Sequence, residues 1–198
     1  IKIGSSSEYG TKNHPMKESE IIVPNSFYSI GKSAQTHLAS FLSVSKKIPI
    51  ITFRLFSVYG PYEESNRFII NLIKNTINNT DMPLNDPKIA RDFIFIDDVS
   101  ELLYKSLQYK KNDGPIFNLG SGNQNTLGRA FKETVKILKS KTKPIIGSYE
   151  KRQFDTNIWV ADMKKTCKEF KWKPKYNLRI GLKKTAEWYK EHKNLYEK

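Results

Sequence analysis

The sequence predicts an α/β protein built on a doubly wound parallel sheet, and three observations lead to that prediction. Segments with strand-like and helix-like hydrophobic spacing alternate along the chain of 198 residues. The segment Ile48–Phe56 is apolar nearly throughout, as expected of a strand buried on both faces beneath layers of helices. Turn and capping residues separate the segments, and neither an internal repeat nor a low-complexity tract interrupts them.

The first half of the chain is predicted to form two strands and two helices. A polar loop at 4–10 follows a short strand, and Asn25 or Ser26 is a suitable N-cap for a helix that ends near Lys46. Apolar residues recur at helical spacing in that helix, beginning with Phe27 and Ile30. The expected elements are a strand at 1–3, a helix at 26–46, a strand at 48–56, a turn at 59–61 and a helix at 67–78.

The second half continues the alternation. After a loop at 79–90, Asp97 or Asp98 is expected to cap one helix and Thr126 another. The glycines of Gly120-Ser121-Gly122 predict a turn that ends a strand. The expected elements are strands at 93–96, 116–119 and near 145, and helices at 98–109, 126–139, 162–170 and 178–194.

Composition excludes several classes of protein. The chain weighs 23.0 kDa with 38% hydrophobic residues, enough for a sizeable core and against wholesale disorder. A single cysteine, Cys167, excludes an internal disulfide, and three widely spaced histidines predict no metal site. No run reaches the ~18 apolar residues of a membrane span, and the N-terminus has no signal-peptide pattern. A cytoplasmic protein without a membrane partner is therefore expected.

Charge is unevenly distributed along the chain, whose formal net charge is +14. Residues 1–128 hold 14 basic and 12 acidic residues, whereas residues 129–198 hold 20 and 8. Such a skew suggests a polyanionic partner, either a nucleic acid or a phosphorylated small molecule. Lysines that only solvate the outer faces of helices also explain it, and we favour this interpretation over a polyanionic partner.

The strongest chemical signal is the pair Tyr28 and Lys32 in the first long helix. Residues four apart on a helix lie one turn apart on the same face, separated by a rise of roughly 6 Å. A nearby ammonium stabilises the phenolate form of tyrosine, so such a tyrosine can pass a proton to or from a sugar hydroxyl or ketone. Taken alone the pair is weak, because this spacing often arises by chance.

Four further motifs accompany the pair in a fixed order. They are Ser5-Ser6-Ser7-Glu8-Tyr9-Gly10, Arg54-Leu55-Phe56-Ser57-Val58-Tyr59-Gly60-Pro61, Arg91-Asp92-Phe93-Ile94-Phe95-Ile96-Asp97-Asp98-Val99, and Asn118-Leu119-Gly120-Ser121-Gly122. With these motifs the chain resembles the extended short-chain dehydrogenase/reductase family, the NAD-dependent nucleotide-sugar epimerases and dehydratases. The resemblance covers essentially the whole chain. It implies a Rossmann-like NAD(P)-binding domain and a smaller α/β lobe that binds a nucleotide-diphosphate sugar.

The resemblance implies roles for individual residues. Ser5 matches the catalytic Ser/Thr that hydrogen-bonds the C4 oxygen, Tyr28 the general acid/base, and Lys32 the lysine that holds the nicotinamide ribose. Arg91 matches an arginine that pairs with the substrate diphosphate, with an ion pair to Asp97 or Asp98 as the alternative. The remaining implied contacts are Phe56, Ser57 and Val58 along the nicotinamide, and Ser6, Ser7, Ser57, Arg67 and Arg152 toward the substrate. Ser57 stands where many members have Asn.

The residues after Ser5 favour one reaction type over another. Dehydratases of the family use an Asp-Glu pair directly after the Ser/Thr to remove water, and here those places hold Ser6 and Ser7. A hydroxyl cannot replace a carboxylate acid or base. The expected activity is therefore that of an epimerase or a 4-keto reductase acting at C4. The resemblance also implies NAD or NADP as cofactor and a homodimer through the helix that bears Tyr28. The alternatives are a basic nucleic-acid-binding module, for which no motif is found, and a non-catalytic relative that binds a sugar nucleotide.

The glycine-rich dinucleotide fingerprint is absent from the 198 residues. The first strands of such a sheet would need on the order of 100 further residues. The chain is therefore expected to be the C-terminal two-thirds of an enzyme and inactive alone. In this interpretation residues 1–62 and part of 90–125 belong to the Rossmann-like domain, and residues 63–90 and 126–198 form the substrate-binding lobe.

Overall fold

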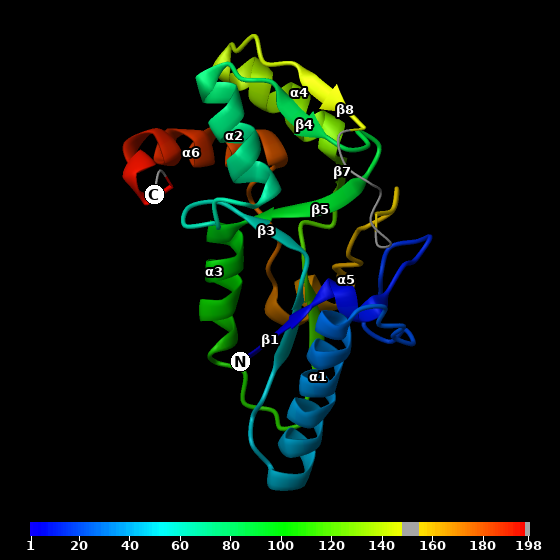
Figure 1. Cartoon of the computed structure of the whole chain (residues 1–198). Coiled ribbons are helices and arrows are strands. Elements are labelled where there is room, and N and C mark those ends of the chain that lie inside the picture. The colour runs from blue at the N-terminus through cyan, green and yellow to red at the C-terminus, as the bar shows by residue number, and fades with distance from the viewer. Residues whose placement is uncertain (148–154, 197–198) are drawn as a thin grey trace.

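The computed structural model describes residues 1–147 and 155–196. It is an α/β structure in which a lower body around one parallel sheet supports an upper lobe of helices and short strands (Figure 1). The body contains β1 (Lys2–Ser5), the 3₁₀ turn η1 (Ser6–Tyr9), α1 (Phe27–Lys46), β2 (Thr52–Leu55), α3 (Ile96–Ser106), β6 (Ile116–Leu119) and α5 (Lys164–Phe170). The lobe contains β3 (Ser57–Tyr59), α2 (Phe68–Asn78), β4 (Met82–Leu84), β5 (Ala90–Phe95), β7 (Gln124–Thr126), α4 (Leu127–Leu138), β8 (Pro144–Ile146), α6 (Leu178–Glu191) and η2 (Lys193–Leu195).

The sheet of the body is parallel, in the strand order β1-β2-β6. Its apolar face carries Phe53 and Phe117, which pack against Leu102 of α3 and Phe170 of α5. Trp159 and Trp172 join this core. Helix α1 lies on the opposite side of the sheet from α3 (Figure 1), so the sheet is covered on both faces.

The lobe is built around a second sheet, in the order β3-β5-β7, and a two-stranded pair of β4 and β8. Helices α2, α4 and α6 bury their apolar faces against Tyr59, Phe93 and Phe95 of that sheet. Because β2 and β3 are separated by Phe56 alone, the chain passes directly from the body sheet into the lobe. Residues at the ends of both sheets are thereby brought together.

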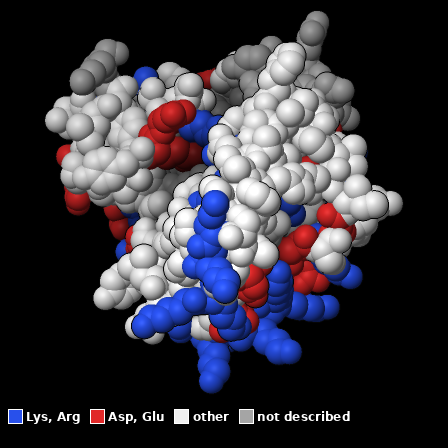
Figure 2. Space-filling model, turned by 90° about the horizontal axis from the view of Figure 1, so that it is seen from below, with Lys and Arg blue, Asp and Glu red and all other residues white. Residues whose placement is uncertain are grey.

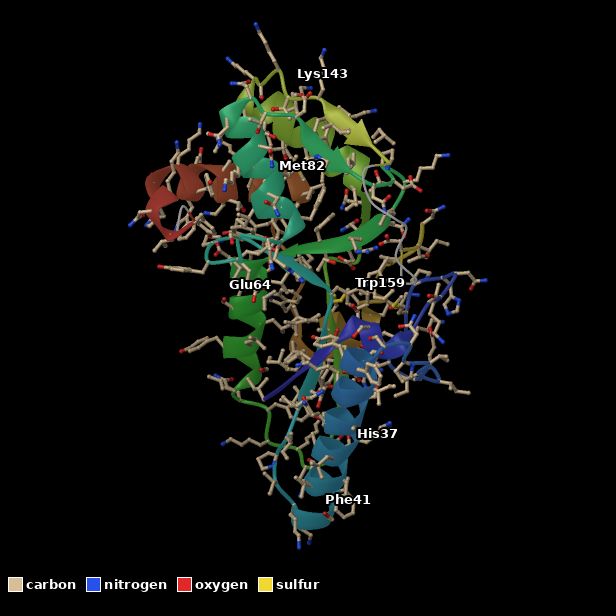
Figure 3. The ribbon with its side chains drawn as sticks, in the orientation of Figure 1. His37, Phe41, Glu64, Met82, Lys143 and Trp159 are labelled. Atoms are coloured by element: carbon tan, nitrogen blue, oxygen red, sulfur yellow. The ribbon has the colours of Figure 1, made fainter. Side chains whose placement is uncertain are left out.

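Helix α1 faces the sheet with small residues and exposes its large apolar residues. The side chains that face the sheet are small and mostly polar, namely Ser29, Ser33, Thr36, Ala39 and Ser43. The large apolar residues whose spacing predicted the helix point outward: Phe27 is 96% exposed and Phe41 63% exposed. Figure 3 shows His37 and Phe41 on the outer side of this helix. Small residues allow close approach of α1 to the sheet, and a broad apolar surface is left outside.

The structure corrects several predicted boundaries. The strand predicted at 48–56 is shorter, since only Thr52–Leu55 pairs in a sheet, and the loop predicted at 79–90 contains β4. Phe95, not Asp97 or Asp98, is the N-cap of α3, and the two aspartates lie in its first turn. The strand β7 was not predicted, because its polar sequence Gln124-Asn125-Thr126 gains its pairing from β5. The last helix ends at Glu191 and is followed by a 3₁₀ turn.

The charge of the C-terminal third lies on the surface. Six exposed lysines fall within 164–175, on α5 and the residues after it. Seen from below, Lys and Arg side chains gather along one edge of the molecule, beside a wide area without charged residues (Figure 2). Within the described residues, no helix combines the length and the apolar character needed to cross a membrane.

Candidate active site

Ser5 lies at the carboxyl end of β1 and is the N-cap of the turn η1. Its Oγ accepts a hydrogen bond from the Ser7 backbone N–H at 3.2 Å and lies 2.8 Å from Ser7 Oγ. Ser6 Oγ is buried and accepts a hydrogen bond from Trp159 Nε1 at 3.1 Å. The three predicted serines are therefore fixed at the end of a parallel strand, which is where ligands bind in open α/β sheets.

Tyr28 and Lys32 occupy the first turns of α1, as predicted, and their side chains are neighbours. Lys32 Nζ lies 5.8 Å from the centroid of the Tyr28 ring and donates a hydrogen bond to the Ile3 carbonyl oxygen at 3.1 Å. The helix begins at Phe27 because Ser26 caps it, with its side chain accepting the Ser29 N–H. The Ile3 contact brings Lys32 to within two residues of Ser5 on β1, so the structure unites the three predicted catalytic residues on two adjacent elements.

Arg91 lies on β5 and its pairing differs from both sequence-based alternatives. Its Nη2 donates to Asp155 Oδ1 at 2.9 Å, and the guanidinium carbon lies 5.8 Å from the centroid of the Trp159 ring. Neither Asp97 nor Asp98 is the partner. Trp159 lies between the turn after β1 and strand β5 (Figure 3), so it connects Arg91 with Ser6.

The other predicted contacts lie around the junction of body and lobe. Phe56 is buried in the body core between β2 and β3, and Ser57 and Val58 begin β3. Arg67 is the exposed N-cap residue of α2, with its Nε 3.8 Å from Glu63 Oε1. Arg152 lies outside the described residues. The structure thus places Arg67 and Arg91 in the lobe and the serine, tyrosine and lysine in the body.

The Gly120-Ser121-Gly122 turn does not present its amides to a ligand. Asp92 accepts hydrogen bonds from the backbone N–H groups of Ser121 at 2.7 Å and Gly122 at 3.1 Å. It also accepts the N–H of Ala161 at 3.0 Å. Burial raises the pKa of Asp92, while these hydrogen bonds favour its ionised form. The turn is a structural connection, and a Cβ at Gly120 would lie 2.6 Å from the Asp92 carboxylate.

Sequence reasoning missed a buried polar cluster directly beneath Ser5. Glu8 is fully buried and pairs with Arg54 of β2 (Oε2 to Nε, 2.9 Å). Lys2 reaches the same carboxylate, with its Nζ 3.7 Å from Glu8 Oε1, and burial lowers the pKa of Lys2. Glu8 and Arg54 lie within two of the sequence motifs, but no pattern in the sequence indicates that residues 46 positions apart are partners.

The chain matches the model of the family described as GDP-mannose 4,6 dehydratase over residues 1–185. A curated relative, UDP-glucuronate 4-epimerase from Thermodesulfobacterium geofontis, is 29% identical over 97% of this chain and 59% of its own length. dTDP-glucose 4,6-dehydratase from Escherichia coli is 25% identical over 98% of this chain and 59% of its own length. The chain therefore spans less than two-thirds of the length of these relatives.

Solved structures agree with this result. The UDP-glucuronic acid 4-epimerase of Bacillus cereus, solved with UDP-glucuronic acid and NAD, aligns with a TM-score of 0.88 and 26% identity. The alignment covers 96% of this chain and 60% of that one. The dTDP-glucose 4,6-dehydratase of Bacillus anthracis, with NAD, shares the fold at a TM-score of 0.85 and 22% identity, over 98% of this chain and 62% of that one. These likenesses confirm the predicted Rossmann-like α/β class. Since the family model covers most of its residues, the chain belongs to the GDP-mannose 4,6 dehydratase family, within the NAD-dependent nucleotide-sugar epimerases and dehydratases.

Proposed function

We propose that this chain carries the proton-transfer and diphosphate-binding residues of an NAD- or NADP-dependent nucleotide-sugar epimerase or 4-keto reductase. The observation that carries the proposal is the placement of Tyr28 and Lys32 on α1 beside the strand that ends at Ser5. The family and the relatives described above support a nucleotide-sugar substrate, and the Bacillus cereus structure contains NAD.

In this proposal Tyr28 exchanges a proton with the C4 oxygen of the sugar. Lys32 stabilises the phenolate form of Tyr28 by its charge, and the Ser5 hydroxyl holds the same oxygen by a hydrogen bond. The nicotinamide cofactor, when bound, supplies or accepts the hydride at C4. Arg91, with Arg152, binds the substrate diphosphate, and Arg67 lines the nucleotide pocket. Arg91 exchanges part of its contact with Asp155 for phosphate oxygens.

The turn after β1 supports an epimerase or reductase over a dehydratase. Ser6 and Ser7 are hydroxyl residues held by hydrogen bonds to Trp159 and Ser5. The next carboxylate in the sequence, Glu8, is buried and paired with Arg54, so it is not available as an acid or base at the surface of the site. The second candidate, a 4,6-dehydratase, is favoured by the dehydratases among the relatives.

The described residues fit only one end of a dinucleotide. Tyr28, Lys32 and the segment Phe56–Val58 can contact the nicotinamide end, whereas the sequence has no glycine-rich loop for the pyrophosphate. We propose that residues outside these 198 supply that loop, and that the chain alone is inactive. The sequence-based division is residues 1–62 and part of 90–125 on the cofactor side, and 63–90 and 126–198 in the substrate lobe. The structure departs from it at two elements, because α5 packs in the core of the body and β3 pairs with β5 in the lobe.

The exposed apolar face of α1 supports the proposed homodimer. Phe27, Ile30, Leu38, Phe41 and Val44 all lie on the surface of this helix. A continuous apolar surface of this kind is typical of an interface between proteins. Phe41→Lys is expected to shift the protein from dimer to monomer in analytical ultracentrifugation. The control is Tyr104→Lys, at an exposed residue of α3, which is expected to leave the protein dimeric. A dimer that persists in Phe41→Lys contradicts the interface.

The activity is tested with the protein purified at the length its source produces. UDP-glucuronate, UDP-glucose and dTDP-glucose are each incubated with NAD or NADP, and the products are identified by NMR and mass spectrometry. A C4 epimer is the expected result with NAD or NADP. Reduction of an added 4-keto sugar nucleotide is the expected result when NADH or NADPH is supplied as the hydride donor. Loss of water to a 4-keto-6-deoxy product supports the dehydratase, and no turnover of any sugar nucleotide contradicts both candidates.

A further inference from the structure

The polar cluster around Glu8 links the elements that carry Ser5, Tyr28 and Lys32. Glu8 Oε1 accepts the backbone N–H of Ser5 at 2.9 Å and lies 3.1 Å from the Thr36 hydroxyl of α1. Glu8 Oε2 accepts from Arg54 Nε of β2 at 2.9 Å. One carboxylate therefore contacts the backbone of Ser5, the helix that bears Tyr28 and Lys32, and the strand that leads to Phe56.

Two lysines connect β1 and α1 in opposite directions. Lys2 of β1 donates to the Lys32 carbonyl oxygen at 3.1 Å and to the Thr36 hydroxyl. Lys32 of α1 donates to the Ile3 carbonyl oxygen at 3.1 Å. This reciprocal pair limits both sliding and rotation of α1 along β1. It also holds the Lys32 ammonium at the end of the strand where Ser5 lies.

Strand β1 leaves space for the Glu8 carboxylate at Gly4. A Cβ at Gly4 would lie 2.8 Å from Glu8 Oε1 and 3.1 Å from the Phe53 carbonyl oxygen, so the glycine makes space for Glu8. A buried charge is expensive to desolvate, and apolar residues of similar volume are often as stable or more stable. Net stability alone therefore explains this arrangement poorly, whereas a requirement for fixed geometry explains it directly.

We propose that Glu8 is a positioning residue, which sets the place of Ser5 relative to Tyr28 and Lys32. This inference rests on the proposed function and deepens it. Glu8 touches no reacting atom. It acts through the Ser5 amide and through Thr36, while Arg54 and Lys2 neutralise its charge. The sharpest consequence is that Glu8 matters to turnover only while Ser5 is present.

The test uses Glu8→Gln, which keeps the shape of the side chain and removes its charge. Asp98→Asn is the matched control, because Asp98 is also fully buried and accepts backbone N–H groups, from Lys175 and Tyr176, far from the three catalytic residues. Hydrogen exchange of the Ser5 amide is expected to become on the order of tenfold faster in Glu8→Gln and to stay unchanged in Asp98→Asn. Ser5 exchange that stays at the wild-type rate in Glu8→Gln overturns the proposal, whether or not the enzyme turns over.

Turnover of the protein at its native length gives the second measurement. Glu8→Gln is expected to lower kcat about 10- to 100-fold with an unchanged KM for the sugar nucleotide, and to lower it little further in a Ser5→Ala background. Independent, additive effects of the two substitutions overturn the proposal, as does a loss no larger than that of Asp98→Asn. If Glu8→Gln folds poorly, Thr36→Val is the milder variant to use, because it keeps the Glu8–Arg54 pair. Thr36→Val is expected to lower kcat several-fold. Absence of turnover in the wild type contradicts the proposed function alone, and Ser5 exchange still decides the role of Glu8.

Discussion

Helices α1 and α6 differ in where their large apolar residues lie. α6 buries Leu178, Leu182, Ala186 and Tyr189 in the lobe core, whereas α1 buries small and hydroxyl residues and exposes its large apolar ones. The difference shows that α6 packs through its large apolar residues, whereas α1 approaches β1 through small residues and leaves its large apolar ones exposed. Amphipathic spacing predicts a helix, but it does not tell which partner covers the apolar face.

Two leucine substitutions, one on each helix, are expected to give the largest difference in the free energy of unfolding. Leu182→Ala on α6 removes a fully buried side chain, so we expect a loss of about 2–5 kcal/mol in the free energy of unfolding. Leu38→Ala on α1 removes a side chain that is 57% exposed, and the expected change in the monomer is within about 0.5 kcal/mol. Urea unfolding of both variants at low protein concentration measures the difference. Equal losses would show that the outer face of α1 is buried in the monomer.

The second prediction compares the buried carboxylate of Glu8 with the partly buried carboxylate of Glu63. Glu8 beside α1 has Arg54 as a partner, whereas Glu63 Oε2 in the lobe has no hydrogen-bond partner among the described residues. Burial raises the pKa of Glu63 to about 7, with Arg67 opposing the shift. The folded protein therefore holds a proton that the unfolded chain releases near pH ~4.3, and stability is lost as the pH rises from there through 7.

Glu63→Gln is thus expected to be more stable than the wild type at pH 8, by on the order of 3 kcal/mol. The advantage is expected to shrink toward pH 5. Urea unfolding at both pH values is the measurement, and Glu133→Gln, which removes an exposed ion pair with Arg179, is the control. A constant difference between Glu63→Gln and wild type at the two pH values would contradict a raised pKa.

A third prediction uses one glycine from each helix. A Cβ at Gly181 of α6 would lie 2.0 Å from the Tyr59 hydroxyl oxygen, whereas a Cβ at Gly31 of α1 meets nothing within 4 Å. Gly181→Ala is expected to destabilise the protein by about 1–3 kcal/mol. Gly31→Ala is expected to stabilise it by about 0.5–1 kcal/mol, because alanine is the better helix former. Thermal unfolding of the pair gives opposite shifts in Tm if α1 is open at Gly31, and a lower Tm in both variants if it is not.

Local signals predicted most of the fold. Ser26 and Thr126 are helix caps as expected, because a capping side chain acts on amides only a few residues away. The short strands β4 and β7 could not be predicted, since their pairing depends on partners distant in the sequence. The same limit applies to the orientation of α1, because small buried residues at helical spacing give no hydrophobic signal.

The candidate site was predictable to a similar extent. Ser5, Tyr28 and Lys32 lie in motifs whose spacing is local, and the structure brings them to adjacent elements. The partner of Arg91 was not predictable, because Asp155 is 64 residues away and no charge pattern marks it. The Glu8–Arg54 pair was missed for the same reason. Buried ion pairs are properties of tertiary structure, and the sequence shows only that their members exist.

In the proposed function, Tyr28 transfers the proton at C4 of a nucleotide sugar. The most direct measurement is steady-state turnover of the native-length protein and its Tyr28→Phe variant, with binding of the sugar nucleotide measured in parallel by calorimetry. We predict that kcat falls about 100- to 10,000-fold while the dissociation constant of the sugar nucleotide stays the same. Wild-type turnover by Tyr28→Phe would contradict the claim.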